Sequence, residues 1–167
     1  MDVLSAIKAR RSIRKYEKRP IPKEVMEDLL DSAKLAPSAN NLQRFHVVVV
    51  TDDRVKERLV KVCGGQEFIA DCYAFLVGVN ELGAFYSCVD MTIALDHLSL
   101  RAVELGLGTC WIGDFEPDKV KDILDIPGDR EIPICMTLGY PAQSPPARRR
   151  KALSEIFLKD KWGNGWD

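Results

Sequence analysis

Residues 85–112, FYSCVDMTIALDHLSLRAVELGLGTCWI, contain the longest regular pattern of the chain and decide its fold class. From residue 85 to residue 105 the apolar side chains leave little polar surface on the later turns. This pattern predicts a helix that lies in a core or in a subunit interface. Gly106 is expected to end the helix, and residues 109–112 to form a short strand. A long apolar helix followed at once by a strand indicates helices packed on a sheet.

The segments on either side alternate between helical and strand patterns. Residues suited to a helix start occur at four places, Asp2, Pro22, Asp52 and Pro117. Runs typical of buried strands occur at 45–50, 73–79 and 132–138. Pro133 places the first part of the last strand at an edge or at its beginning. We therefore predict an α/β or α+β fold, a sheet with helices on its faces, in a single domain over residues 1–167.

Composition excludes several classes of protein. The chain has 167 residues, 46% of them hydrophobic, and a net charge of −1, which fits one globular domain. It has no apolar run long enough to span a membrane and no signal-peptide core at its start. The five cysteines are scattered without a C-x-x-C pair, so we expect buried thiols rather than a disulfide framework or a zinc site. We predict a cytoplasmic protein without a metal.

Basic residues gather near the two ends of the chain. Residues 1–19 contain seven Lys or Arg and two acids, and residues 148–151 are all Arg or Lys. These clusters are either two separate solvated patches or, if the fold joins them, one anion site. Arg10, Arg11, Ser12 and Arg14 have the groups of a phosphate cradle, with Arg10 and Arg14 aimed the same way on a helix or turn. Arg148 and Arg150 would project together from an extended segment.

Two further segments contain side chains that the predicted helices and strands do not account for. The first segment is polar, and the second contains large apolar residues. Residues 38–43 contain Ser38, Asn40, Asn41 and Gln43, which suit either an ordinary turn or hydrogen bonds to the edge of a heterocycle. Residues 147–167 form a tail with six large apolar side chains, Leu153, Ile156, Phe157, Leu158, Trp162 and Trp166. We expect this arm to wrap its own body or, preferably, a second subunit. The sequence pI of about 6.2 argues against a nucleic-acid partner.

Four motifs, taken together, resemble those of one protein family. They are ARRSIRKY at 9–16, APSANNLQ at 36–43 with the strand that follows, GLGTCWIG at 106–113, and LGYP at 138–141 before the basic tail. In this order they are similar to the nitroreductase-like family of FMN-dependent oxidoreductases, and the chain resembles a small member. The resemblance implies an α+β fold with a mixed or antiparallel sheet, and a homodimer with FMN at the subunit interface.

The resemblance also implies which residues bind the cofactor. Arg10, Arg11, Ser12 and Arg14 match positions that hold the FMN phosphate and ribityl chain, and Arg148 and Arg150 match tail residues that reach the phosphate. Pro37, Ser38, Ala39 and Asn41 match a loop that approaches the flavin from the other subunit. Ile112 and Gly113 match a turn whose backbone lies by the isoalloxazine ring. No side chain is expected to be catalytic, because FMN performs the chemistry.

The implied activity is ping-pong hydride transfer from NADH or NADPH to a small acceptor. The candidate acceptors are nitroaromatics, quinones, free flavins and enones. A flavin carrier without turnover, or other flavin chemistry such as reductive dehalogenation, remains the alternative.

The chain departs from the family pattern in ways that bear on its pocket. Arg44 stands where a proline is usual and Phe45 where a tryptophan is usual. The segment from 65 to 90 is short, which leaves the pocket open or built by the tail. Asp114 replaces a common glycine, where it either places a charge near the flavin or, as we prefer, caps the helix after Pro117.

Overall fold

The computed structural model describes residues 1–166, except for the side chain of Phe85. The elements, in chain order, are α1 (Val3–Ala9), β1 (Tyr16–Glu17), α2 (Lys23–Lys34), η1 (Ala39–Asn41), β2 (Phe45–Val50), α3 (Asp53–Val62), α4 (Phe68–Asp71), β3 (Ala74–Glu81), α5 (Phe85–Glu104), β4 (Gly108–Ile112), α6 (Pro117–Leu124), β5 (Arg130–Glu131), β6 (Cys135–Pro141) and η2 (Leu153–Glu155).

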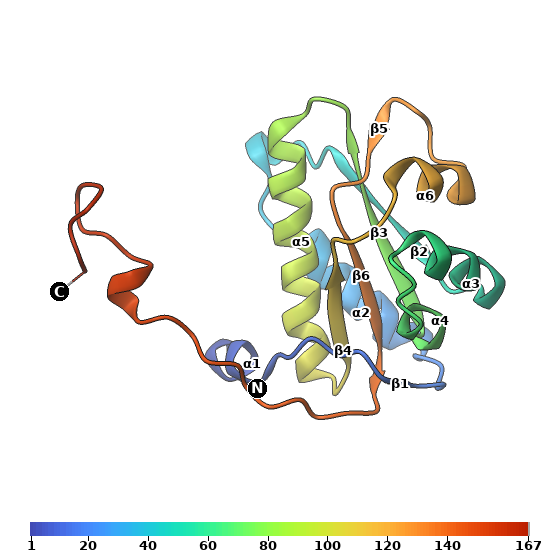
Figure 1. Cartoon of the computed structure of the whole chain (residues 1–167), viewed down its shortest axis with the longest axis horizontal. Coiled ribbons are helices and arrows are strands. Elements are labelled where there is room, and N and C mark those ends of the chain that lie inside the picture. The colour runs from blue at the N-terminus through green and yellow to red at the C-terminus, as the bar shows by residue number, and fades with distance from the viewer. Residues whose placement is uncertain (167) are drawn as a thin grey trace.

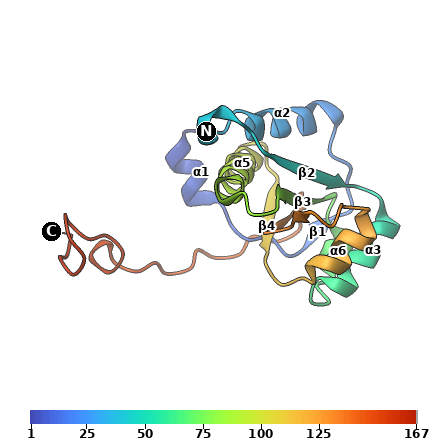
Figure 2. The ribbon, with the colours of Figure 1, turned by 90° about the horizontal axis from the view of Figure 1, so that it is seen from above.

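The strands form an antiparallel sheet with helices on both faces (Figures 1 and 2). β6 pairs with both β4 and β3, β3 pairs with β2, and the short strands β1 and β5 add to β6 and β3. One apolar cluster joins the sheet to α2 and α5, and a second joins its other face to α3, α4 and α6. The predicted α+β class is thus confirmed.

Local sequence signals explain where several helices begin and end. The Asp2 carboxylate accepts a hydrogen bond from the Ser5 N–H at 3.0 Å, and the Asp52 carboxylate accepts one from the Val55 N–H at 3.0 Å. Both caps satisfy donors that the first helical turn leaves unpaired. After α3 the chain reverses at Gly64 and Gly65, whose φ angles are +62° and +67°. Left-handed backbone of this kind favours glycine, as expected at a helix end.

Helix α5 is buried along one stripe only. Met91, Leu95, Leu98 and Ala102 are fully buried, whereas Val89 is 44% exposed. The prediction that this helix lies in a core therefore holds for one face alone. The opposite face of α5 is not covered by other described parts of the chain. Burial of this face in a subunit interface remains a prediction.

Two strand predictions are corrected. Residues 45–50 were expected to form a fully buried strand, but β2 lies at a sheet edge and only Val50 is buried. The strand expected over 132–138 begins at Cys135, with Pro133 in the irregular segment before it. A proline donates no backbone hydrogen bond. Pro133 therefore interrupts the pairing with β3, which stops at the end of β5 and resumes at the start of β6.

The last part of the chain leaves the body. Beyond β6 the polypeptide passes α1 and then extends away as an arm over residues 147–166 (Figures 1 and 2). Its apolar side chains are exposed, Trp162 at 95%. The structure thus shows no wrapping of the arm around its own body in the residues it describes. The alternative, a partner subunit, remains a prediction.

Candidate functional site

The two basic clusters meet in one cleft. Its volume is about 540 Å³, and it lies where the arm crosses the end of α1. Six of its lining residues are cationic and none is acidic; the twelve residues are Ile7, Lys8, Arg10, Arg11, Ser12, Arg14, Gln143, Pro145, Pro146, Ala147, Arg148 and Arg150. The fold therefore joins segments that are far apart in sequence into one positively charged surface. Of the two interpretations of the charge pattern, the structure supports the joined one.

Residues 10–14 reach the cleft in extended backbone, not on the helix or turn that we expected. α1 ends at Ala9, and the Ile13 N–H donates to the Thr109 carbonyl at 2.9 Å, so this segment lies along β4. Side chains alternate in extended backbone. Ile13 points into the core, where it packs against Gly108, while Arg10, Ser12 and Arg14 line the cleft. Arg10 and Arg14 therefore do not face the same way through i, i+4 spacing, as we expected. They do so because alternate residues of extended backbone lie on the same side.

The arginines in the cleft differ in whether they form hydrogen bonds or ion pairs with other groups of the chain. Arg11 Nη1 donates to the carbonyls of Lys8 and Arg10, both at 2.7 Å, and so closes the C-terminus of α1. Among the residues described, no carboxylate forms an ion pair with Arg10, Arg14, Arg148 or Arg150. These four guanidinium groups are free to bind an anion from outside the chain.

Cys110 lies beneath the cleft on β4. Burial raises the pKa of its thiol, an effect that the charge of Arg14 and a hydrogen bond with Ser12 partly oppose. Burial also raises the pKa of Cys63 and of Cys72, each to about 12. Four cysteines are buried, and Cys88 is partly exposed. The prediction of structural thiols therefore holds for the four buried ones.

The loop with Pro37, Ser38, Ala39 and Asn41 lies at the opposite end of α5 from the cleft. Its Ala39 N–H donates to both carboxylate oxygens of the buried Asp90, each at 3.1 Å. The amino group of Met1 bonds Glu104 at 2.7 Å and places α1 at the other end of the helix. Glu104 follows Asp90 by 14 positions in α5, which is about 21 Å of helical rise. In one chain, therefore, the loop and the cleft do not meet.

The conformation of this loop is held by its own polar groups. Asn40, Asn41 and Gln43 have positive φ angles of 50°, 56° and 50°. The Gln43 N–H donates to Ser38 Oγ at 3.2 Å, and Ser87 Oγ donates to the Arg44 carbonyl. Non-glycine residues in left-handed backbone are uncommon and persist where surrounding bonds fix them. These bonds give the loop a defined shape, and hydrogen bonds from the loop to a heterocycle remain a prediction.

Ile112 and Gly113 lie at the end of β4, apart from the cleft lining. The Ile112 side chain is buried, so only its backbone could face a ligand, whereas Gly113 is exposed. The favoured role of Asp114 was wrong. Glu116 occupies the N-cap position of α6, without a side-chain bond, and the Asp114 carboxylate lies against Gly64.

Sequence reasoning missed several residues at this site. Lys8 and Gln143 line the cleft. Asp90 fixes the loop, and its signal was a carboxylate between the apolar residues Val89 and Met91 of the long helix. Gln66 bonds the segment after β4, and no sequence signal identified it, because the bond joins positions 48 residues apart.

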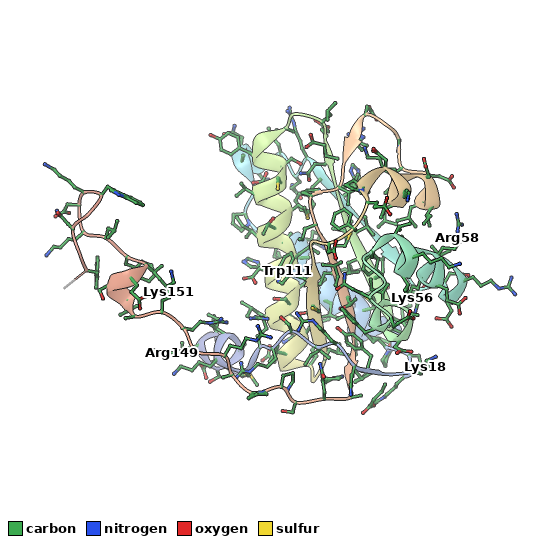
Figure 3. The ribbon with its side chains drawn as sticks, viewed as in Figure 1. Lys18, Lys56, Arg58, Trp111, Arg149 and Lys151 are labelled. Carbon is green, nitrogen blue, oxygen red and sulfur yellow. The ribbon has the colours of Figure 1, made fainter. Side chains whose placement is uncertain are left out.

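A second cavity does not compete as an anion site. It has a volume of about 250 Å³ and is lined by residues of both charge signs, among them Asp53, Lys18 and Lys56. Figure 3 labels the two lysines. The buried Lys56 ammonium already bonds the Cys72 carbonyl and pairs with Asp53 at 2.9 Å. Within residues 1–166 no cluster of metal-ligating side chains is found, and no described helix has the length and apolarity needed to cross a membrane.

Comparison with known proteins identifies the family. The model of the nitroreductase family matches residues 7–79 and 63–140. A relative from Methanothermobacter thermautotrophicus, named "Putative NADH dehydrogenase/NAD(P)H nitroreductase", is 34% identical over 97% of this chain and 88% of its own length.

Solved structures agree with this result. Nitroreductase A from Vibrio parahaemolyticus superposes with a TM-score of 0.93 at 27% identity, over 98% of this chain and 78% of that one. An FMN-dependent nitroreductase from Clostridium difficile superposes with a TM-score of 0.85 at 26% identity, over 95% and 99% of the two chains. The chain belongs to the nitroreductase family and is an oxidoreductase of that family.

Proposed function

We propose that the chain is an FMN-dependent enzyme that uses NADH or NADPH to reduce a small acceptor. The observation that carries the proposal is the basic cleft, where Arg10, Arg14, Arg148 and Arg150 gather without a carboxylate partner among the described residues. A phosphate monoester has the charge and the acceptor oxygens that such guanidinium groups bind. The FMN-dependent relative from Clostridium difficile and the NAD(P)H named for the archaeal relative support the same choice.

The cleft would hold the phosphate end of FMN. Ser12 adds a hydroxyl between the two arginines of the same extended segment, and Arg148 and Arg150 close the site from the arm. Arg11 contributes charge, but its Nη1 is already bonded to backbone carbonyls. The backbone of Ile112 and Gly113 would lie by the ring. Bound FMN would supply hydride acceptance and donation, which no side chain of this protein can perform.

We propose that two copies of the chain build each site. Pro37, Ser38, Ala39 and Asn41 would approach the flavin held by the partner subunit, because the length of α5 separates them from the cleft of their own chain. The exposed face of α5 and the exposed apolar side chains of the arm would be covered in the same dimer. The chain is then one domain over 1–167, with residues 147–167 as an arm that embraces the partner.

The residues of the protein would contribute by positioning the bound molecules and by placing charges and hydrogen-bond donors beside them. Backbone N–H groups near Gly113 are available to the flavin edge, where donors stabilise negative charge. No titratable side chain of the described residues is required as a nucleophile. We place the enzyme in a reducing cytoplasm, which suits five free cysteines. Nitroaromatics, quinones, free flavins and enones are the proposed acceptors, in a ping-pong cycle.

Steady-state kinetics test this proposal. NADH and NADPH oxidation would be followed with each acceptor class, with and without added FMN. Parallel double-reciprocal lines and dependence on FMN are expected. Bound flavin without NAD(P)H oxidation would refute the enzyme mechanism and leave a flavin carrier.

A further inference from the structure

The segment that follows β4 is held in place by the turn that follows α3. Gln66 Nε2 donates to the Cys63 carbonyl at 2.9 Å and to the Asp114 carbonyl at 3.3 Å. The Glu116 N–H donates to the Val62 carbonyl at 2.8 Å. Two hydrogen bonds thus join residues 62–66 to residues 114–116, on the side of the sheet where α3 and α6 lie together (Figure 1).

Gly64 leaves room beside this connection for the Asp114 carboxylate, because it has no side chain. A Cβ added there would overlap the Asp114 carboxylate, with Asp114 Cγ 3.0 Å away. The neighbouring Gly65 has nearly the same backbone, φ +67° against +62°, yet a Cβ added at Gly65 meets nothing within 4 Å. The two glycines therefore differ in one respect, the contact with Asp114. Burial and, to a smaller extent, the charge of Asp114 raise the pKa of the Cys63 thiol, which agrees with this proximity.

We infer that Gly64 and Gln66 are positioning residues, which fix the Gly113–Asp114 backbone at the place where the flavin ring is proposed to lie. The inference rests on the proposed function, because it needs a ring beside Gly113. On the side where a Cβ would point, Gly113 has open space, since an added Cβ would meet only Ile134 Cδ1, at 3.8 Å. The hydrogen bonds of Asp114 and Glu116 to the turn after α3 restrain the backbone that follows it. A displacement of about 1 Å in a reacting geometry can reduce a rate about 100-fold.

The experiment compares Gly64→Ala with Gly65→Ala in the full-length protein loaded with FMN. Both variants place alanine in left-handed backbone, so both report the general cost of that strain. Gly64→Ala alone displaces the exposed Asp114 carboxylate from its position over the turn, and it is through this displacement that we expect it to disturb the backbone at Gly113. We expect kcat/KM for the nicotinamide substrate to fall about 10- to 100-fold further in Gly64→Ala, while FMN affinity stays within about threefold of Gly65→Ala, because the phosphate cleft is unchanged.

A second readout does not depend on turnover. The FMN midpoint potential and visible spectrum should shift in Gly64→Ala and not in Gly65→Ala. A tenfold change in the ratio of the dissociation constants for oxidised and reduced FMN corresponds to about 30 mV for a two-electron couple. The double variant Gly64→Ala/Asp114→Gly removes the clash, so its potential and kcat/KM should equal those of the single variant Asp114→Gly.

Gln66→Glu tests the hydrogen bond if Gly64→Ala does not fold. The substitution keeps the length of the side chain and replaces the donor with an acceptor facing two carbonyl groups, so the same shift in potential is expected. Equal potentials and equal kinetics in Gly64→Ala and Gly65→Ala, with Gln66→Glu like the unmodified protein, would overturn the inference. If the unmodified protein binds no FMN, the proposed function fails instead, and the two failures are thereby distinguished.

Discussion

Removing the guanidinium group of Arg14 should weaken FMN binding without weakening the fold. The Arg14 side chain is exposed, lines the basic cleft and forms no ion pair among the described residues. The fold therefore loses no intramolecular bond in Arg14→Ala, and the free energy of unfolding of the apo-protein should change by less than about 0.5 kcal/mol. A charge-assisted hydrogen bond to phosphate contributes about 1.5–3 kcal/mol. We expect the FMN Kd to rise about 10- to 150-fold.

Lys15→Ala is the matched control for this variant. Lys15 is the next residue, is also exposed and has the same charge, but it does not line the cleft. Its removal changes the Kd only through screened long-range charge, less than about threefold at physiological salt. Arg14→Lys should lie between the two, since lysine keeps the charge and loses the planar pair of donors.

Fluorescence titration of apo-protein with FMN measures all three constants. An unchanged Kd in Arg14→Ala, or an equal rise in Lys15→Ala, would refute the assignment of a phosphate contact to Arg14. A loss of binding together with a fall in Tm in Arg14→Ala would show instead that the residue supports the fold.

Three further outcomes are expected. Truncation before Ala147 should abolish tight FMN binding and dimer formation while Tm of the remaining body changes little; a truncated dimer that retains FMN by size-exclusion chromatography would contradict the embracing arm. Asp90→Asn should speed hydrogen exchange at the Ala39 amide at least tenfold and raise KM more than it lowers kcat, because a charged acceptor of that amide is lost; unchanged exchange would refute this. The free energy of unfolding should decrease as pH rises above about 9, because the pKa of Cys72 is raised from 9.0 to about 12 in the folded protein and the unfolded thiol loses its proton first; denaturation at pH 8 and pH 10 measures it, and Cys72→Ala should reduce the slope.

Local signals in the sequence were sufficient for most elements of the fold. Asp2 and Asp52 cap their helices because a carboxylate next to a helical pattern acts on the first turn directly. The edge position of β2 could not be predicted in this way. A β-branched run has the same appearance at the edge and at the centre of a sheet, and only the pairing partners distinguish the two.

The sequence predicted the arginines that line the cleft, but not the backbone conformation that places them there. Charge at both ends of the chain suggested an anion site, and the structure joins Arg10 and Arg14 to Arg148 and Arg150. The backbone around Ser12 could not be inferred, because its pairing with Thr109 is a long-range contact. The role preferred for Asp114 failed for a similar reason. Its neighbour Gly64 is fifty residues away in sequence, so no local pattern reveals the contact.

A visible absorption spectrum of the purified protein, recorded without oxygen before and after NADPH or NADH is added, tests the proposed function most directly. We expect the bands of oxidised flavin, which bleach when either nucleotide is added and return with a nitroaromatic or quinone acceptor. Bands that persist with both nucleotides would contradict the NAD(P)H-dependent enzyme. A colourless protein that binds no added FMN would contradict the assignment of the basic cleft.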